Sequence, residues 1–396
     1  MSLLKVNEVQ NYNGSSLTLT ASTVSTSAQL NTGGNISVTG SLNVSDDSTT
    51  RSNLGLGSIA TQDSSNVSVT GGSITGTTIV PTSPFTFRNR IINGDMRIDQ
   101  RNGGASVGPF ASASAGYKGV DRWFIATHTM TSQQITGNAP SSFSHYLKLT
   151  KGSGSNIDIR QTVELPAAGQ AGEFYNGSSW TLSFYAKSAS GGETLNFSSY
   201  FRQGIATGTF TSITAPSGVT LTTSWVRYEV VFTIDAAPSA SDLCIAFAFN
   251  TTATELHLTG VMLEEGTVAT PFEHRPISVE LSLCQRYAYR YGGEILNDTY
   301  GARAGLYADG NQINFGPIEF PVNMRSTASM IPYGSGIRVK ENGGAYTGWT
   351  VTLSSSTNSK QAFVNMSKSS HGVPVGVKTH LNFATPADYL IFQSEL

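Results

Sequence analysis

Two stretches of alternating sequence decide the fold: Trp180-Thr-Leu-Ser-Phe-Tyr-Ala-Lys187 and Val226-Arg-Tyr-Glu-Val-Val-Phe-Thr-Ile234. In each, apolar side chains occupy every second position, and a β-strand sends alternate side chains to opposite faces. Leu243-Cys-Ile-Ala-Phe-Ala-Phe249 repeats the pattern, and turns rich in glycine, serine, asparagine and proline separate such runs. Alternation sustained over about 190 residues predicts an antiparallel β-sandwich of the jelly-roll kind.

The composition supports an all-β protein and excludes several partners. Of the 396 residues, 38% are hydrophobic and 13% are charged, against roughly 45–50% and 25% in ordinary globular domains. The formal net charge is −2 and no basic stripe is present, so we expect no nucleic acid partner. Because no apolar run approaches the roughly 18 residues that span a bilayer, we expect no membrane insertion.

Residues 1–88 differ from the rest because serine and threonine dominate and charges are sparse. Asn35-Ile-Ser-Val-Thr-Gly40 recurs as Asn66-Val-Ser-Val-Thr-Gly71, each copy a short β run closed by a glycine turn. One copy has too little apolar surface to fold alone. A disordered Ser/Thr linker is one interpretation. The regular Val/Ile alternation favours the other, a thin β-rich shaft wound from identical chains.

The chain after residue 88 divides into two further regions. Charged and aromatic residues appear from Arg88, and the alternating strands continue to Arg275. Pro276 and the spacing of Ile277, Leu281 and Cys284 predict one helix over 276–291. β texture then returns to residue 396. We therefore predict three regions: a shaft and attachment region (1–88), a jelly-roll domain (89–275) and a C-terminal β tip domain introduced by the helix (276–396).

Three stretches resemble bacteriophage tail fibre proteins. The first, Arg51-Ser-Asn-Leu-Gly-Leu-Gly-Ser-Ile-Ala60, is similar to their shaft-and-linker motif. The second pairs Asn89-Arg-Ile-Ile-Asn-Gly-Asp-Met96 with Leu263-Glu-Glu-Gly-Thr-Val-Ala-Thr-Pro-Phe-Glu-His-Arg-Pro276. It resembles tail proteins whose central module is like a carbohydrate-binding jelly roll. The third, Glu280-Leu-Ser-Leu-Cys-Gln-Arg-Tyr287, is similar to the C-terminal domain that follows that module.

The resemblance implies a structural component of the virion tail that mediates adhesion to the host cell surface. Such proteins are commonly homotrimers. Their N-terminal end contacts a phage tail or baseplate protein, and their distal end faces host surface polysaccharide or lipopolysaccharide. The start of the sequence has no signal-peptide pattern, so we expect synthesis in the host cytoplasm. The alternatives are a glycan-degrading tail enzyme and a structural connector of the tail that binds no ligand.

The titratable residues favour a binding protein over an enzyme. Glycosidases need two carboxylates at a set separation, and carboxylates are scarce in the middle region. We expect Asp121 in a structural ion pair, Glu264 and Glu265 in a turn, and Glu273 in a local salt bridge. A calcium ion held by Asp95, Asp99 or Asp121 is open, but no ligand spacing identifies one, so no metal or cofactor is predicted. Cys244 and Cys284 are expected to be buried free thiols.

Sugar binding needs exposed aromatic faces, and five residues are candidates. In the tip domain Tyr333, Tyr346 and Trp349 occur in glycine-rich sequence, where recognition loops are expected. In the jelly roll, Trp225 begins a strand opposite its apolar face, and Tyr200 lies close to turn residues. The alternative is that all five are packing residues, because large aromatic side chains are mostly buried.

Overall fold

The computed structural model describes residues 87–395 except 110–115, 127–128, 153–155, 203–209, 293–303, 310–311, 342–343, 370–378 and 385–386. The described residues all belong to one unit of the chain, residues 80–396. The predicted shaft, its two near-repeats and the tail-fibre-like linker lie outside the described residues. The trimeric shaft therefore stays a prediction, and the rest of the description concerns this unit.

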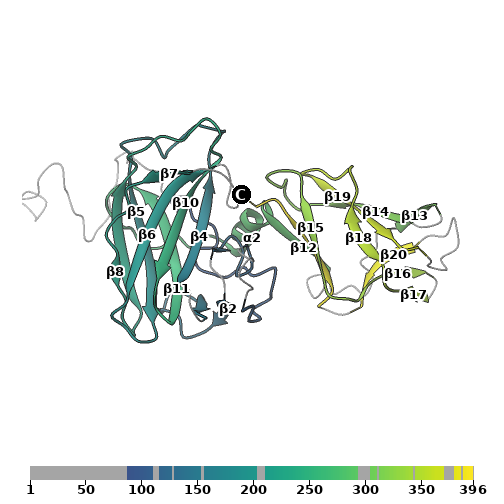
Figure 1. The fold of residues 1–396 in the computed structure, drawn as a ribbon, viewed down its shortest axis with the longest axis horizontal. Coiled ribbons are helices and arrows are strands. Elements are labelled where there is room, and N and C mark those ends of the chain that lie inside the picture. Colours follow the sequence, from purple (N-terminus) through teal and green to yellow (C-terminus); the bar gives the residue numbers. More distant parts are fainter. Residues whose placement is uncertain are drawn as a thin grey trace, which may run out of the picture. The chain divides into compact units, whose positions relative to one another are not determined.

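The middle of the chain is a sandwich of two antiparallel β-sheets, which confirms the predicted all-β jelly-roll fold (Figure 1). One sheet has the order β1-β4-β10-β6-β7, with β8 also paired to β6, and strands β4, β10 and β6 run side by side in Figure 1. Its strands are β1 (Phe124–Ile125), β4 (Ile157–Glu164), β10 (Cys244–Thr251), β6 (Thr194–Arg202), β7 (Phe210–Ile213) and β8 (Val219–Thr220). The other has the order β2-β3-β11-β5-β9. Its strands are β2 (Thr131–Thr136), β3 (His145–Thr150), β11 (Glu255–Glu265), β5 (Ser179–Ser188) and β9 (Val226–Thr233).

The side chains that decided the fold from the sequence form the core between the sheets. Trp180 and Phe184 are fully buried, and Phe249 of the opposite sheet is 1% exposed. Phe184 meets Phe249 edge-on, with 5.2 Å between ring centroids, and Phe174 stacks on Trp180 at 4.4 Å. Each such side chain contributes roughly 1.5–3 kcal/mol by leaving water, so this layer supplies most of what holds the sandwich together.

The segment before β1 packs against β11 at Val261 and Leu263, and this contact depends on a glycine. A Cβ on Gly94 would lie 2.1 Å from the Val261 carbonyl oxygen, and the backbone N–H of Val261 donates to the Gly94 oxygen at 2.9 Å. The side chain of Asn89 donates to the same Val261 oxygen at 3.1 Å and accepts from the N–H of Leu263. The motif Asn89–Met96 thus serves to attach the segment to the sandwich.

Helix α2 (Ile277–Gln285) is shorter than predicted. Residues 288–291, assigned to the helix from the sequence, form strand β12 (Ala288–Tyr291) instead. The buried helix positions are Glu280 and Cys284, whereas Ile277 is 51% exposed. Arg275 explains the difference, because it pairs with the Glu280 carboxylate at 3.3 Å and so holds a polar residue inside. Among the described residues, no helix has the length and apolar character of a membrane span.

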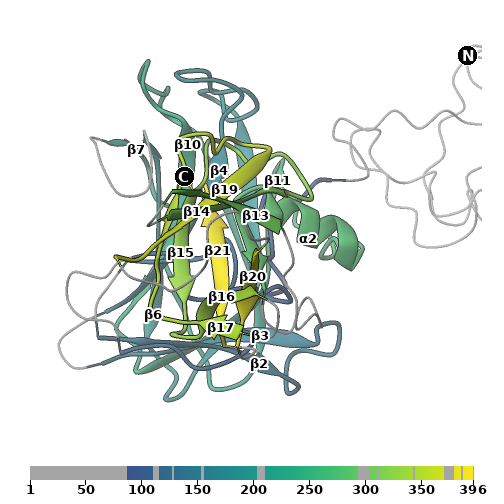
Figure 2. The same ribbon diagram turned by 90° about the vertical axis from the view of Figure 1, so that its right-hand side faces the viewer.

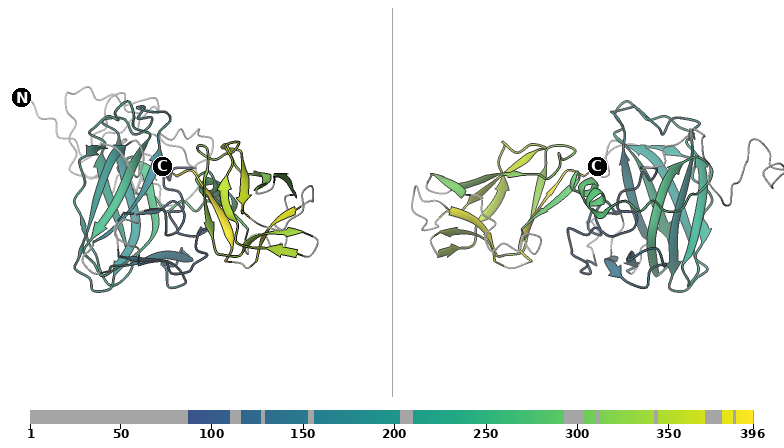
Figure 3. Two further views of the ribbon diagram at one scale, coloured as in Figure 1. Left: turned by 45° about the vertical axis from the view of Figure 1, so that its right-hand side comes forward. Right: turned by 180° about the vertical axis from the view of Figure 1, so that it is seen from behind.

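The residues after α2 form two β-sheets, as predicted for the tip domain. A three-stranded sheet joins β12, β21 (Tyr389–Gln393) and β15 (Ser329–Tyr333); Figure 2 shows β15 beside β21. The seven-stranded sheet has the order β17-β16-β20-β13-β14-β19-β18. Its strands are β17 (Gly344–Tyr346), β16 (Ile337–Glu341), β20 (Thr379–Phe383), β13 (Ala304–Asp309), β14 (Gln312–Glu319), β19 (Gln361–Ser367) and β18 (Thr350–Leu353). In the described residues α2 is the one α-helix, the coiled ribbon in Figure 3.

A buried set of charges, the Glu395 cluster, ties residue 395 to the sandwich. Its members are Arg101, Asp121, Arg122 and Glu395. Arg101 lies 3.0 Å from a Glu395 carboxylate oxygen and 3.4 Å from Asp121, and Arg122 contacts the other Glu395 oxygen. Both arginine side chains are at most 1% exposed. The predicted structural ion pair of Asp121 is confirmed, although its partner is Arg101 and not the adjacent Arg122.

Candidate functional site

A β-bulge in β11 creates a seat for an aromatic ring. The pairing of β11 with β5 shifts register between Thr259 and Met262. Gly260 lies in this bulge with φ +61°, and a Cβ there would approach the Phe143 ring to 2.5 Å. Because glycine lacks that carbon, the ring can lie directly on the strand. Phe143 arrives from the loop between β2 and β3, where its N–H closes a turn on the Pro140 oxygen at 2.8 Å.

Four rings gather at this seat. The Phe143 ring centroid is 5.4 Å from that of Tyr185, 5.1 Å from that of Phe272 and 5.3 Å from that of His274. Phe272 and His274 lie on the segment that follows β11. Thr270 fixes that segment, since its N–H and hydroxyl both donate to the Glu264 carboxylate at 2.8 and 2.6 Å. The cluster is therefore held by three parts of the chain that are distant in sequence.

Two cavities have Phe143 and His274 in their lining, and together they form the Phe143 cleft. Each has a volume of about 360 Å³, in the lower part of the range for small-molecule sites. One is lined by Asp95, Arg97, Ser141, Ser142, Phe143, Ser144 and His274. The other is lined by Ser142, Phe143, Tyr185, Arg227, Pro271, Phe272 and His274. The two cavities share Ser142, Phe143 and His274, so a ligand longer than either cavity could occupy both.

Asp95 gives the first cavity a hydrogen-bond acceptor that the protein does not use. The residue is 4% exposed, and its Oδ2 pairs with Arg97 Nε at 2.5 Å. Its Oδ1 is buried and has no hydrogen-bond partner among the described residues. Arg97 is itself held, because its Nη2 donates to the Arg275 carbonyl at 2.8 Å. Buried polar atoms are nearly always paired, so Oδ1 is an acceptor that a water or a ligand hydroxyl in the cavity could use.

The second cavity has a fixed cation. Arg227 on β9 donates from Nη2 to the Thr270 carbonyl at 2.5 Å and pairs from Nη1 with Glu229 at 2.5 Å. The cleft combines the ring of Phe143, the guanidinium of Arg227, serine hydroxyls and the unused oxygen of Asp95. Together these groups can bind a polyhydroxylated ring. Its C–H face would pack on an aromatic side chain and its hydroxyls would meet the polar groups. Asp95 is the one carboxylate in the lining, so the cleft lacks the pair that glycosidases use.

Trp225 and Tyr200 lie elsewhere in the sandwich and are partly covered. Trp225 donates its Nε1–H to the Asn138 carbonyl at 2.8 Å, with its ring edge-on to Tyr146 and 5.2 Å from the Lys187 ammonium. Tyr200 accepts a hydrogen bond from Arg160 at 2.6 Å, and its ring packs against Phe210. Neither lines the Phe143 cleft, and the ring of each already contacts other residues of the sandwich.

Of the tip-domain candidates, the side chains of Trp349 and Tyr333 are described, and both pack against other residues. Trp349 is 8% exposed and belongs to the core of the tip domain, so its expected exposure on a loop is wrong. It directly precedes β18, which pairs with β19, and its side chain packs in the same core as Val364 and Met366 of β19. The ring of Tyr333 stacks on Tyr389 with 4.7 Å between centroids. Tyr346 ends β17, and its side chain lies outside the described residues, so its role stays a prediction.

The remaining polar candidates have structural partners. Glu273 accepts from the backbone N–H groups of Phe87 and Asn89 and lies 3.8 Å from Arg275, as the predicted salt bridge requires. Asp99 accepts from the N–H groups of Asn102 and Gly104. Within the described residues, no three His, Cys, Asp or Glu side chains are grouped to hold a metal ion. Cys244 and Cys284 are buried free thiols, which confirms that prediction.

Comparison with known proteins adds only partial likenesses. No protein-family model and no curated protein sequence matches the chain. The enzymatically active domain of tailspike protein 4 of bacteriophage CBA120 is 17% identical with a TM-score of 0.28, over 45% of this chain and 22% of that one.

Two carbohydrate-binding modules also align with part of the chain. The xylan-binding CBM22-1 domain of Paenibacillus barcinonensis is 12% identical (TM-score 0.27, 42% and 97% covered). The C-terminal family 22 carbohydrate-binding module of Clostridium thermocellum Xyn10B is 16% identical (TM-score 0.27, 38% and 89% covered). At these scores the likenesses carry no conclusion about this chain.

Proposed function

We propose that this protein is a glycan-binding adhesion protein and that the Phe143 cleft is its binding site. The observation that carries the proposal is the unused Oδ1 of Asp95 beside the ring of Phe143. Leaving a buried polar atom unpaired costs roughly 1–3 kcal/mol, and a sugar hydroxyl that donates to Oδ1 would remove this penalty. The ring supplies the apolar face on which the same sugar would lie.

The biological setting that we propose is the tail fibre of a bacteriophage. The motifs at residues 51–60, 89–96 and 263–276 and the repeats in residues 1–88 support this proposal. The N-terminal region would attach to the tail, and three copies of the cleft would face the host surface. Multivalent attachment raises overall affinity by orders of magnitude without new contacts, so a small cleft is sufficient in a trimer.

The test measures binding of the full-length protein to an array of bacterial surface polysaccharides. We expect Phe143→Ala to weaken binding by about 1–3 kcal/mol, or about 5- to 150-fold. Asp95→Asn should weaken it too, because the amide places an N–H where a carboxylate oxygen accepted. Phe210→Ala is the matched control: Phe210 is 60% exposed on the other sheet and lies outside the cleft.

Three results would contradict the proposal. Undiminished binding by both cleft variants would place the glycan site elsewhere, and the Trp225→Ala, Tyr200→Ala and Tyr333→Ala variants would then locate it. Release of oligosaccharides from a bound polysaccharide would indicate a glycan-degrading enzyme. Failure to bind any surface polysaccharide, or to block adsorption of virions to host cells, would indicate a structural connector.

A further inference from the structure

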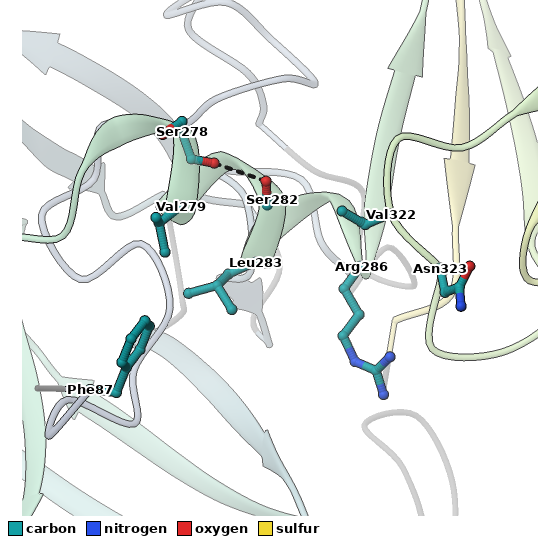
Figure 4. A pocket seen from close by; sticks show the side chains of 8 residues that line it. All are labelled: Phe87, Ser278, Val279, Ser282, Leu283, Arg286, Val322 and Asn323. Carbon is teal, nitrogen blue, oxygen red and sulfur yellow. Dashed lines mark hydrogen bonds between the residues drawn. The ribbon is translucent and has the colours of Figure 1, made fainter. Parts of the chain in front are cut away.

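The arginines that line the described cavities are all paired with carboxylates. Two of these cavities form the Phe143 cleft, and a third, of about 570 Å³, lies beside helix α2 (Figure 4). The pairs are Arg97 with Asp95 and Arg227 with Glu229 in the cleft, each at 2.5 Å, and Arg286 with Glu164 beside α2, at 2.9 Å. Each of these positive charges already has a counterion, so none gives its cavity an excess of positive charge.

Lys187 differs from these arginines because it forms no ion pair with any described residue. It is partly exposed on β5, and its ammonium lies 5.2 Å from the centroid of the Trp225 ring. Across the sheet, His257 of β11 stands in register between Lys187 and Lys148. Lys148 and His257 share the Glu255 carboxylate, at 2.6 and 3.0 Å. Lys187 is therefore the cation of this row that the described residues leave without a counterion.

Lys187 lies directly beside the Phe143 cleft. Tyr185, two residues earlier on β5, lines the second cavity, as does Arg227, its partner in register on β9. Alternate residues of a strand point to the same face and are about 6.6–6.8 Å apart. Lys187 is thus the next side chain on that face beyond the cavity, and Trp225 is its counterpart two residues before Arg227. The ammonium and the indole extend the cleft by one step along the sheet.

Asp95 determines which end of the cleft a negative group could occupy. Its carboxylate lines the first cavity and not the second. A like charge placed beside it would disfavour binding, so a sugar at that end should be neutral and donate a hydroxyl to the unused Oδ1. At the other end a negative group would meet Arg227 and then Lys187, where it would find a positive charge without a counterion.

We propose that the glycan bound in the Phe143 cleft is acidic, and that Lys187 binds the negative group of the sugar unit next to the cleft. This inference rests on the proposed function and adds the class of ligand, a polysaccharide in which a neutral sugar adjoins one that carries a carboxylate or a phosphate. The ring of Trp225 restricts the Lys187 side chain before the ligand arrives, so less side-chain entropy is lost on binding.

The test compares binding of the full-length protein to capsular polysaccharides that contain uronic acids and to the same polysaccharides after reduction of their carboxyl groups to alcohols. We expect the reduced forms to bind at least about fivefold more weakly at low salt, the worth of one exposed ion pair at about 4 Å. Lys187→Gln should show no preference between the two forms, whereas Lys187→Arg should retain the preference. The matched control is Lys360→Gln, which removes an exposed lysine of the tip domain and should keep the preference of the unmodified protein.

Polysaccharides with phosphodiester groups form a second arm, compared with the same polysaccharides after dephosphorylation. A preference that Lys187→Gln removes, in either arm, supports the inference and identifies the group that is bound. If the protein binds polysaccharides but neither arm shows such a preference, the inference is overturned and the proposed function stands. If the unmodified protein binds no polysaccharide in any form, the proposed function fails and the inference fails with it.

Discussion

Removing the Glu395 carboxylate should destabilise the folded unit strongly. Glu395 is the shared partner of two arginines whose side chains are at most 1% exposed. Burial lowers the pKa of the Arg101 guanidinium, but the nearby charges of Glu395 and Asp121 outweigh it and leave that pKa raised. Arg101 therefore stays charged in the interior, and Glu395→Ala leaves a buried positive charge without its nearest counterion.

The expected cost follows from the contacts that remain. After the substitution Arg101 keeps Asp121 at 3.4 Å. Arg122 keeps the Thr162 carbonyl at 2.8 Å and the ring of Tyr287, whose centroid is 3.5 Å away. Breaking one partner of a buried pair costs about 3–5 kcal/mol. At about 2–4 °C per kcal/mol for a domain of this size, Tm should fall by about 6–20 °C.

Circular dichroism melts of three variants distinguish the charge from the bulk of the side chain. Glu395→Gln keeps the size and one acceptor, so its Tm should fall less than that of Glu395→Ala. Glu319→Ala removes an exposed carboxylate from β14 and should change the free energy of unfolding by no more than about 0.5 kcal/mol. A Tm for Glu395→Ala within about 2 °C of the Glu319→Ala value would refute the reasoning, because the two arginines would then be stable without Glu395.

Three further predictions concern other parts of the chain. Burial raises the pKa of Asp121 to about 7 despite the opposing charge of Arg101. Because the folded-state pKa lies above that of an aspartate in the unfolded chain, the protonated Asp121 carboxyl stabilises the folded state fully below about pH 4. That stabilisation is lost as the pH rises through 7. The Asp121→Asn variant should therefore show a flatter dependence of Tm on pH between 4 and 7, and an unchanged slope would count against this. Gly260→Ala should lower the free energy of unfolding by roughly 1–3 kcal/mol and weaken glycan binding, because the alanine Cβ would meet the Phe143 ring. The control is Gly177→Ala, also at positive φ but with open space around it, and it should lower the free energy of unfolding less. Sedimentation equilibrium of the full-length protein should give three times 41.9 kDa, and a stable monomer would contradict the wound shaft.

The β-sandwich could be predicted from the sequence because each strand carries its own alternation of apolar and polar residues. The apolar positions of Trp180–Ala186, and Ile245, Phe247 and Phe249 of the Leu243–Phe249 run, all enter the core, as their alternation predicts. The alternation does not predict that intervening residues such as Thr181, Ser183 and Ala246 are buried as well. The helix was predicted less well, since Glu280 is buried through Arg275, a pairing that apolar periodicity cannot reveal. Its C-terminal end was missed for a related reason: residues 288–291 pair with β21, about 100 residues later in the chain.

The Phe143 cleft could not be predicted because its parts are distant in sequence. The sequence offers Asp95 only as an open calcium ligand, and it gives His274 no ligand spacing that would single it out. The sequence around Phe143 contains one usable signal, a single aromatic residue among serines in Pro140-Ser-Ser-Phe-Ser-His145. Tyr333 is likewise a single aromatic residue beside small turn-forming residues. That signal was not specific, since Trp349 in a similar context is a core residue.

Each component of the cleft is fixed by contacts that need no ligand. The Gly260 bulge seats Phe143, Thr270 holds the segment that carries Phe272, and Arg97 holds Asp95. A ligand would therefore meet a preformed site and would have few loops to order, which reduces the entropy that opposes binding. The small volume of each cavity limits how many contacts one sugar can make, so each cleft should bind weakly and exchange rapidly. If the protein is the trimeric fibre proposed above, these weak sites would combine to give firm attachment, while each single contact would still exchange rapidly.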